Sequence, residues 1–177
     1  MKTIVAGNCV LEPLTKAHAC EMFKVLSDPA IYEFENAPPR SEEWLLTRYK
    51  KLETRQSPDG KQHWLNWVVR LNTDELAGYV QATVLNNGLS YVAYELSSKH
   101  WRKGLGREAV SAMLKELASS YRVNTALAVL KAKNYRSRGL LLNIGFTPAG
   151  EDIVGLANPE PDEFVMVKPL ACAQNAA

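Results

Sequence analysis

The stretch YELSSKHWRKGLGREA, residues 94–109, contains the features that decide the fold. An extended segment leads into a short loop with two glycines, Gly104 and Gly106, and the loop opens a long amphipathic helix. Glycine lets a backbone approach a ligand closely, and the free N–H groups at a helix start attract anions. Arg102, Lys103 and Arg107 add positive charge at the same point. The pattern predicts a binding site for phosphate or pyrophosphate.

Context excludes two common phosphate-binding loops. The chain has no G-x-x-x-x-G-K-[ST] pattern, so the loop is not a P-loop. A Rossmann fingerprint accepts Ala109 as its third small residue, but it follows the first strand of a βαβ unit. Here the loop follows the fourth predicted strand, at the end of an antiparallel meander. The alternative that remains is a tight turn before a helix, with solvated basic residues.

Hydrophobic periodicity divides the rest of the chain into strands and helices. We expect strands at 8–13, 64–71, 76–85, 89–97, 125–130, from 146 onward and at 164–167. We expect helices at 15–26, 41–52, 104–121 and 134–143, with an irregular segment at 31–40. This order predicts an α/β fold with a central mixed sheet of about seven strands flanked by helices. It forms one domain over residues 1–170, and residues 171–177 are expected to be a loose tail.

Composition excludes several classes of protein. Of the 177 residues, 46% are hydrophobic and 23% charged, which rules out a disordered, collagen-like or coiled-coil chain. No apolar run reaches the roughly 18 residues of a membrane span, and residues 1–8 lack the apolar core of a secretory signal. The net charge of +2 is too small to indicate nucleic acid. Three cysteines and three histidines lack metal-ligand spacing, so we expect reduced thiols, no metal and a cytoplasmic protein.

Several motifs in sequence order resemble the GNAT N-acetyltransferase superfamily. The loop WRKGLG after YELSS is similar to its acetyl-CoA loop, and Asn134-x-x-Ser137 with NIGF at 143–146 is similar to its N-x-x-S…G-F helix. Upstream, LEPL at 11–14, SDPAIY at 27–32 and LAGY at 76–79 resemble the RimJ/RimL-type branch. The resemblance covers residues 9–167. It implies the GNAT acyl-CoA N-acyltransferase fold and acetyl-CoA-dependent transfer of acetyl to a primary amine.

The resemblance also implies a set of residues for acetyl-CoA. The backbone at 96–98 would hold the pantetheine arm like an added strand, and the N–H groups at 102–107 would hold the pyrophosphate. Asn134 would contact pantetheine near the thioester, and Arg138 would lie near the adenosine phosphates. Trp101 stands where many members carry Gln or Arg, and the RimJ/RimL branch tolerates it. The implied set is Leu96, Ser97, Ser98, Trp101, Arg102, Lys103, Gly104, Leu105, Gly106, Arg107, Asn134 and Arg138.

Three residues are candidates for catalysis. Many superfamily members protonate the leaving thiolate with a Tyr seven residues after the Asn, but Leu141 stands there. The RimJ/RimL branch resembles this chain in offering Ser137 instead, three residues after Asn134 and hence on the same helix face. The alternative for Ser137 is a first-turn serine bonded to the backbone. Glu95 and Glu35 are candidate bases, acting directly or through water, and the alternative for each is a solvated carboxylate.

The acceptor amine stays open among a peptide N-terminus, an aminoglycoside-type antibiotic and a polyamine-like molecule. Residues 139–167 contain carboxylates but no Lys or Arg. If they flank the acceptor side they favour a cationic amine; otherwise they form a solvated loop. The alternative function is a degenerate GNAT domain that binds CoA as a sensor or scaffold without turnover. The presence of Leu141 supports this alternative, and the intact Asn134/Ser137 pair argues against it. We expect no nucleic-acid or membrane partner, and a monomer or homodimer.

Overall fold

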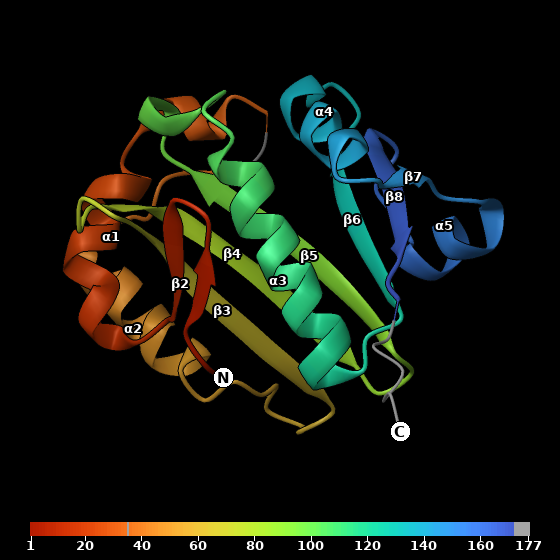
Figure 1. Cartoon of the computed structure of the whole chain (residues 1–177), viewed down its shortest axis with the longest axis horizontal. Coiled ribbons are helices and arrows are strands. Elements are labelled where there is room, and N and C mark those ends of the chain that lie inside the picture. Colours follow the sequence, from red (N-terminus) through yellow and green to blue (C-terminus); the bar gives the residue numbers. More distant parts are fainter. Residues whose placement is uncertain (35, 172–177) are drawn as a thin grey trace.

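One eight-stranded sheet organises the computed structural model, which describes residues 1–34 and 36–171 (Figure 1). In sheet order the strands are β1 (Ile4–Ala6), β2 (Cys9–Pro13), β3 (Gln62–Leu71), β4 (Leu76–Leu85), β5 (Leu89–Leu96), β6 (Thr125–Lys131), β8 (Glu163–Pro169) and β7 (Thr147–Pro148). The α-helices are α1 (Ala19–Leu26), α2 (Glu42–Leu52), α3 (Leu105–Tyr121), α4 (Tyr135–Asn143) and α5 (Glu151–Ala157). Short 3-10 helices are η1 (Lys16–His18), η2 (Pro29–Tyr32) and η3 (Ser98–His100). This mixed sheet with flanking helices confirms the predicted α/β class.

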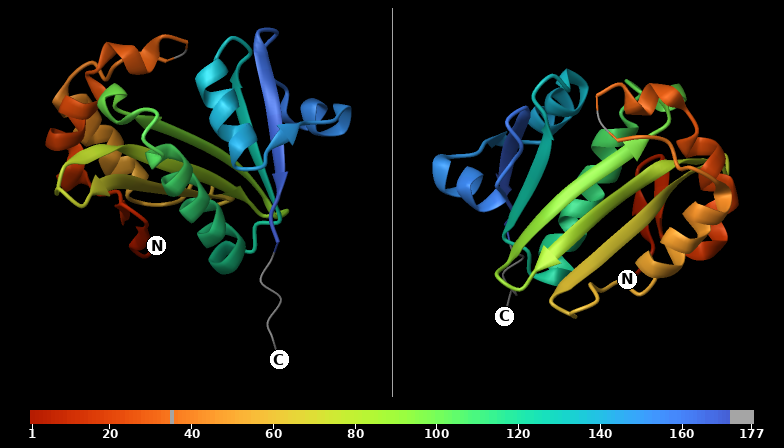
Figure 2. Two further views of the ribbon diagram at one scale, coloured as in Figure 1. Left: turned by 45° about the horizontal axis from the view of Figure 1, so that its top comes forward. Right: turned by 180° about the vertical axis from the view of Figure 1, so that it is seen from behind.

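Alternation along β3 assigns the helices to the two faces of the sheet. Leu65, Trp67 and Val69 pack in one core with residues of α3, whereas Val68 packs in a second core with residues of α1 and α2. Successive strand residues point to opposite faces. Helix α3 therefore covers one face, and α1 and α2 cover the other (Figure 2).

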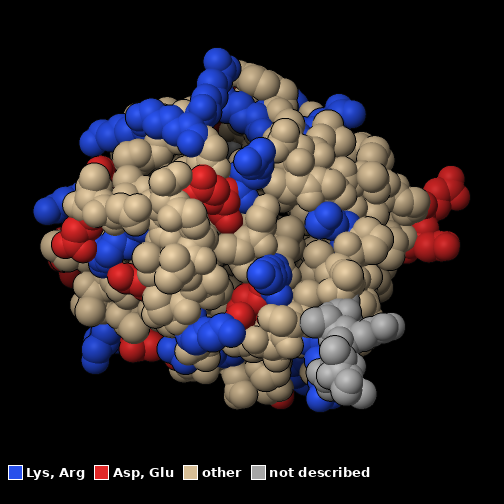
Figure 3. All heavy atoms as spheres, in the orientation of Figure 1, with Lys and Arg blue, Asp and Glu red and all other residues tan. Residues whose placement is uncertain are grey.

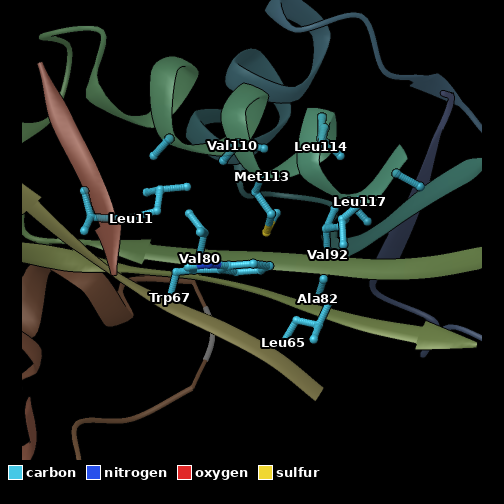
Figure 4. Packing of buried hydrophobic residues seen from close by; sticks show 14 of the residues in the cluster. Leu11, Leu65, Trp67, Val80, Ala82, Val92, Val110, Met113, Leu114 and Leu117 are labelled. Atoms are coloured by element: carbon cyan, nitrogen blue, oxygen red, sulfur yellow. The ribbon is translucent and has the colours of Figure 1, made fainter. Parts of the chain in front are cut away.

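Helix α3 anchors the glycine loop to the sheet. Its buried side chains include Val110, Met113 and Leu117, which face Val80 and Val92 of the sheet (Figure 4). Full burial of a side chain of this size contributes about 1.5–3 kcal/mol. The start of α3 is thereby held firmly over β4 and β5.

The parallel strands β5 and β6 separate along their length. They pair at the three positions from Leu89 to Tyr91. Beyond Tyr91 the two strands diverge, as both panels of Figure 2 show, and β6 pairs along its whole length with β8 on its other side. The end of β5 leads directly through η3 into the glycine loop. The fold therefore brings a separated strand edge next to the loop predicted to bind phosphate.

One strand and one α-helix of the structure are not predicted from the sequence. Strand β1 forms a hairpin with β2, where a single strand at 8–13 is expected, so the sheet has eight strands rather than about seven. The carboxylate of Glu108 in α3 holds the hairpin turn by accepting the backbone N–H of Asn8 at 2.9 Å. Helix α5 occupies part of the acidic segment expected to be a loop, and Glu151 and Asp152 favour its N-terminus. Of the predicted tail, residues 172–177 lie outside the described residues.

Candidate active site

A cavity of about 530 Å³, here called the first cavity, lies between the diverging strands. Residues 92–96 of β5 and 128–130 of β6 form two of its walls. The glycine loop, the first half of α4 and residues around η2 complete it. The cavity begins where the pairing of β5 with β6 ends, so strand divergence creates it.

The glycine loop uses its two glycines for different purposes. Gly104 has φ +83° and precedes α3, and a Cβ there would meet no atom within 4 Å. Gly106 lies inside the helix, where a Cβ would lie 2.5 Å from the Leu140 side chain of α4. Arg102 also adopts a positive φ, +59°. Gly104 thus gives the loop its shape and leaves its backbone open to a ligand, while Gly106 lets α3 approach α4.

The structure brings together most of the cofactor and catalytic residues predicted from sequence. Those that line the first cavity are Glu95, Leu96, Trp101, Arg102, Gly104, Gly106, Arg107, Asn134 and Ser137. Five others do not line it: Ser97, Ser98, Lys103, Leu105 and Arg138. Leu105 belongs to the core, and Arg138 lies over the ring of Phe164, 5.1 Å from its centroid. Glu35 lies outside the described residues.

Ser97 and Ser98 direct their backbone N–H groups into the protein. The Ser97 N–H donates to Ala77 O at 2.8 Å, and the Ser98 N–H donates to the Asp28 carboxylate at 2.9 Å. Burial raises the pKa of Asp28, but the hydrogen bonds from Ser98 and Ala30 outweigh it and hold that pKa below its ordinary value. The strand edge that lines the first cavity is therefore residues 92–96, which share only Leu96 with the predicted segment 96–98.

A tyrosine that the sequence does not predict stands next to Ser137. The Tyr94 hydroxyl of β5 lies 2.9 Å from Ser137 Oγ, and both residues line the first cavity. The Ser137 backbone N–H donates to Asn134 Oδ1 at 3.0 Å, so Asn134 caps α4. Tyr94 shares a strand face with Leu96. That alternation is the signal in the sequence that points to Tyr94, although it does not indicate its partner.

Glu95 lies on the opposite side of β5, among polar partners. Its carboxylate accepts a hydrogen bond from Asn36 Nδ2 at 3.1 Å and is hydrogen-bonded to the Tyr79 hydroxyl. Burial and then the charge of Glu95 raise the pKa of Tyr79 well above its ordinary value, so Tyr79 is a neutral donor. Two donors thus fix the orientation of the Glu95 carboxylate.

An arginine on α4, Arg136, is among the residues that line the first cavity. Arg136 forms an ion pair with Glu33, which follows η2. Its guanidinium also lies over the rings of Trp101, Tyr135 and Phe34, at 4.7, 5.3 and 5.4 Å from their centroids. Tyr135 is exposed and the other two rings are half-buried, so each cation–π contact is worth about 0.5–1 kcal/mol. These contacts tie the segment after η2 to α4.

A second cavity, of about 290 Å³, lies on the α1 and α2 side of the sheet. Asn36, Tyr79, Gln81 and Glu95 line both cavities, so the two meet around Glu95. The remaining walls come from α1, α2, β3 and the segment after η2. Glu95 is thus within reach of a molecule in either cavity.

The acidic run lies away from both cavities. Its carboxylates, Glu151, Asp152, Glu160, Asp162 and Glu163, line neither cavity. Figure 3 shows acidic atoms at the edge of the molecule over α5, while basic atoms gather over the loop between β5 and α3. Lys131 donates to Asp162 at 2.8 Å, and this hydrogen bond lowers the pKa of Asp162. The position of the run gives no support to a role in attracting the acceptor.

The described part of the chain contains neither a cluster of metal ligands nor a membrane-spanning helix. No group of three or more His, Cys, Asp or Glu side chains lies close enough to hold a metal ion among residues 1–34 and 36–171. Within the same residues, no helix has the length and apolarity needed to cross a membrane.

Comparison with known proteins gives a family match over most of the chain. Residues 8–147 match the family model described as an acetyltransferase (GNAT) domain. An uncharacterized N-acetyltransferase, p20 of Bacillus licheniformis, is 24% identical over 152 residues, which cover 85% of each protein. The region matched contains both cavities and the glycine loop.

Solved structures have the same fold at low identity. RimL, a ribosomal L7/L12 α-N-protein acetyltransferase solved with coenzyme A, superposes with a TM-score of 0.78 at 12% identity, covering 95% of this chain and 98% of its own. The ribosomal-protein-S5-alanine acetyltransferase of Vibrio fischeri has a TM-score of 0.74 at 17% identity, covering 97% and 98%. Likeness at this identity concerns the fold, and fold alone does not assign an acceptor.

Proposed function

The chain belongs to the GNAT acetyltransferase family, and from this premise we propose that it transfers acetyl from acetyl-CoA directly to the nitrogen of a primary amine. The observation that carries the proposal is a single cavity with two ends of different chemistry. Arg102, Gly104 and Arg107 line it at the glycine loop, and Tyr94 and Ser137 line it between β5 and α4. An anion-binding loop joined to a pair of hydroxyls suits a thioester with a phosphate-bearing handle.

The residues present fit acetyl-CoA. The open backbone at Gly104 and the guanidinium groups of Arg102 and Arg107 suit a pyrophosphate. The edge of β5 at residues 92–96 faces the first cavity and offers backbone groups to the amides of a pantetheine arm. RimL, which has this fold, was solved with coenzyme A. Acetyl-CoA supplies a thioester whose carbonyl carbon is open to attack by an amine.

Two groups of side chains serve the proton transfers. Glu95 takes a proton from the acceptor ammonium, directly or through water, while Asn36 and Tyr79 orient its carboxylate. As the C–N bond forms and the C–S bond breaks, the sulfur gains a negative charge. Ser137, hydrogen-bonded to Tyr94, donates a hydrogen bond to that sulfur and passes it a proton, and the hydroxyl pair recovers a proton through water from the nitrogen of the tetrahedral intermediate. Tyr94 thereby supplies the phenol that Leu141 does not.

The assignment to the RimJ/RimL-type branch is part of the same proposal. Trp101 in the loop and Ser137 in α4 are the residues that support it, since both are features in which the chain resembles that branch. The fold likeness to RimL is compatible with this assignment.

Release of free CoA thiol tests the function. Purified protein is given acetyl-CoA and, separately, amino acids, peptides, polyamines and aminoglycosides, and acetyl-CoA binding is measured in parallel by calorimetry. We expect binding, and thiol release that depends on one class of amine. Binding without amine-dependent thiol release for any acceptor would contradict turnover and favour a CoA sensor or scaffold.

A further inference from the structure

The second cavity contains one positive and one negative side chain among its described lining residues, Arg48 and Glu95. Arg48 lies over the ring of Trp44, 5.7 Å from its centroid. Among the residues that the structure describes, no carboxylate forms an ion pair with Arg48. A guanidinium held on an aromatic ring at a cavity wall is suited to bind a carboxylate.

A tyrosine with a buried hydroxyl, Tyr49, lines the same cavity as these two charges. Tyr49 is 3% exposed, and its hydroxyl has no hydrogen-bond partner in the described part of the chain. Burial raises the pKa of Tyr49, Arg48 lowers it in part and Glu95 raises it further, so both charges act on the hydroxyl. A buried polar group without a partner is unfavourable, and a polar ligand in this cavity removes the deficit.

The rest of the second cavity is small and combines aromatic and aliphatic side chains with the amides of Asn36, Asn66 and Gln81. Its walls include the aromatic rings of Tyr32, Trp44 and Tyr79 and the side chains of Leu14 and Leu45. Its volume of about 290 Å³ is at the lower end for small-molecule sites. The cavity therefore suits a compact molecule that has an apolar part for the rings and leucines and several polar groups for the amides and charges.

We propose that the acceptor is a free amino acid with an apolar side chain, bound in the second cavity with its amine at Glu95 and its carboxylate at Arg48. The proposal rests on the proposed acetyltransferase function and names its substrate class. Tyr49 donates its hydroxyl hydrogen to the same carboxylate. The amine then lies where the two cavities meet, next to the thioester carried in the first cavity.

Charge disfavours the other acceptor classes. Polyamines and aminoglycosides carry several positive charges, and Arg48 would repel the second of them. The carboxylates expected to attract such cations lie on and near α5, away from both cavities. A peptide N-terminus carries the amine but has an amide where Arg48 requires a carboxylate. The difference between a carboxylate and an amide therefore separates the amino-acid class from peptides.

The test compares phenylalanine and leucine with phenylalaninamide and leucinamide in the thiol-release assay. Each amide keeps the amine and the side chain but lacks the negative charge. We expect the wild type to have a kcat/KM at least about tenfold higher for the acids, which corresponds to one carboxylate–guanidinium pair. The same assay also includes spermidine, which represents the polyamines, and a tripeptide amide with a free N-terminus, which represents peptides.

Variants separate the role of Arg48 from a general loss of charge. Arg48→Gln should raise KM for the acids by about tenfold or more and change KM for the amides by less than about twofold. Lys50→Gln is the matched control, because Lys50 is an exposed cation of the same helix that lines neither cavity. Lys50→Gln should leave the ratio of kcat/KM for the acids to kcat/KM for the amides at its wild-type value. Tyr49→Phe should lower the same ratio by a smaller factor.

Each outcome has one meaning. An amide, a tripeptide amide or spermidine used as well as the acids overturns the amino-acid class and leaves the acetyltransferase function intact. If no amine gives thiol release, the proposed function fails, and phenylalanine is then titrated calorimetrically into the CoA-saturated protein. Binding that Arg48→Gln weakens supports the site independently of turnover. Absence of binding, or binding indifferent to Arg48→Gln, overturns it.

Discussion

The first and second cavities adjoin each other, but backbone forms most of the recognition surface of the first and side chains form that of the second. The first is formed by backbone: a strand edge exposed by the divergence of β5 from β6, and a loop with φ +83° at Gly104. The second is formed by side chains that α1, α2 and three strands contribute, among them Arg48, Tyr49 and Tyr79. Among the described residues, both cavities share Asn36, Tyr79, Gln81 and Glu95.

This difference explains why the sequence predicts the first cavity but does not predict the second. Backbone recognition depends on glycines at fixed spacing next to a helix start, which is a local pattern. Side-chain recognition depends on which residues of distant segments meet. The fold can therefore keep its cofactor half while the acceptor half changes. Substitutions in the two cavities should accordingly have separable effects on acetyl-CoA and on the acceptor.

Glu95→Gln is expected to have the largest effect because Glu95 serves both cavities. Loss of a general base lowers kcat by about 10²–10⁴-fold. Gln keeps the size of the side chain and one acceptor oxygen for Asn36, and the Tyr79 hydroxyl can accept from its NH2 group, so acetyl-CoA affinity should stay within about twofold. Steady-state kinetics and calorimetry on the same preparation measure both quantities. A variant with wild-type kcat would remove Glu95 from the chemistry.

Ser137→Ala tests the hydroxyl pair of the first cavity. We expect kcat and kcat/KM to fall together by about 10- to 100-fold with acetyl-CoA affinity unchanged, since the bond to sulfur forms in the transition state. Ser137 Oγ and the Tyr94 hydroxyl are 2.9 Å apart, so the two residues should act together. The double variant should therefore lose no more kcat than Ser137→Ala and Tyr94→Phe lose in combination. Ser137→Cys should recover part of the rate. Full kcat in Ser137→Ala would make Ser137 a structural residue of α4.

Gly104→Val tests the backbone character of the first cavity. A side chain here is strained at φ +83° and projects into the space that the pyrophosphate needs, so acetyl-CoA affinity should fall by about tenfold or more. Gly60→Val is the matched control, because Gly60 has φ +70°, open surroundings and a position outside both cavities. Both variants should lose about 1–3 kcal/mol of unfolding free energy. Equal calorimetric affinities for acetyl-CoA in the two variants would contradict the assignment of the loop.

Neutralising the acidic run should have the smallest effect. The triple variant Glu160→Gln, Asp162→Asn, Glu163→Gln removes carboxylates that line neither cavity. Surface charge is screened beyond about 8–10 Å at physiological salt. The acceptor KM should therefore change by less than about twofold. A large rise in KM would show that this field reaches the second cavity after all.

Local patterns in the sequence correctly predict much of the fold, and they select residues that the fold brings together around the first cavity. The period of the apolar residues gives the strands and helices, since periodicity reflects which face is buried. The spacing of Asn134 and Ser137 puts them on one turn of α4, where they are hydrogen-bonded. The glycine loop after the fourth predicted strand lies beside a cavity, as its composition indicates.

Only the tertiary structure decides the features that depend on distant residues. The Tyr94–Ser137 pair joins positions 43 residues apart, and the hairpin of β1 depends on Glu108, 100 residues from Asn8. The divergence of β5 and β6 depends on β8 pairing with β6, and the second cavity on how α2 packs over the sheet. Periodicity and spacing describe contacts within a few residues along the chain. Contacts between elements follow from strand register and helix packing, which the whole molecule sets at once.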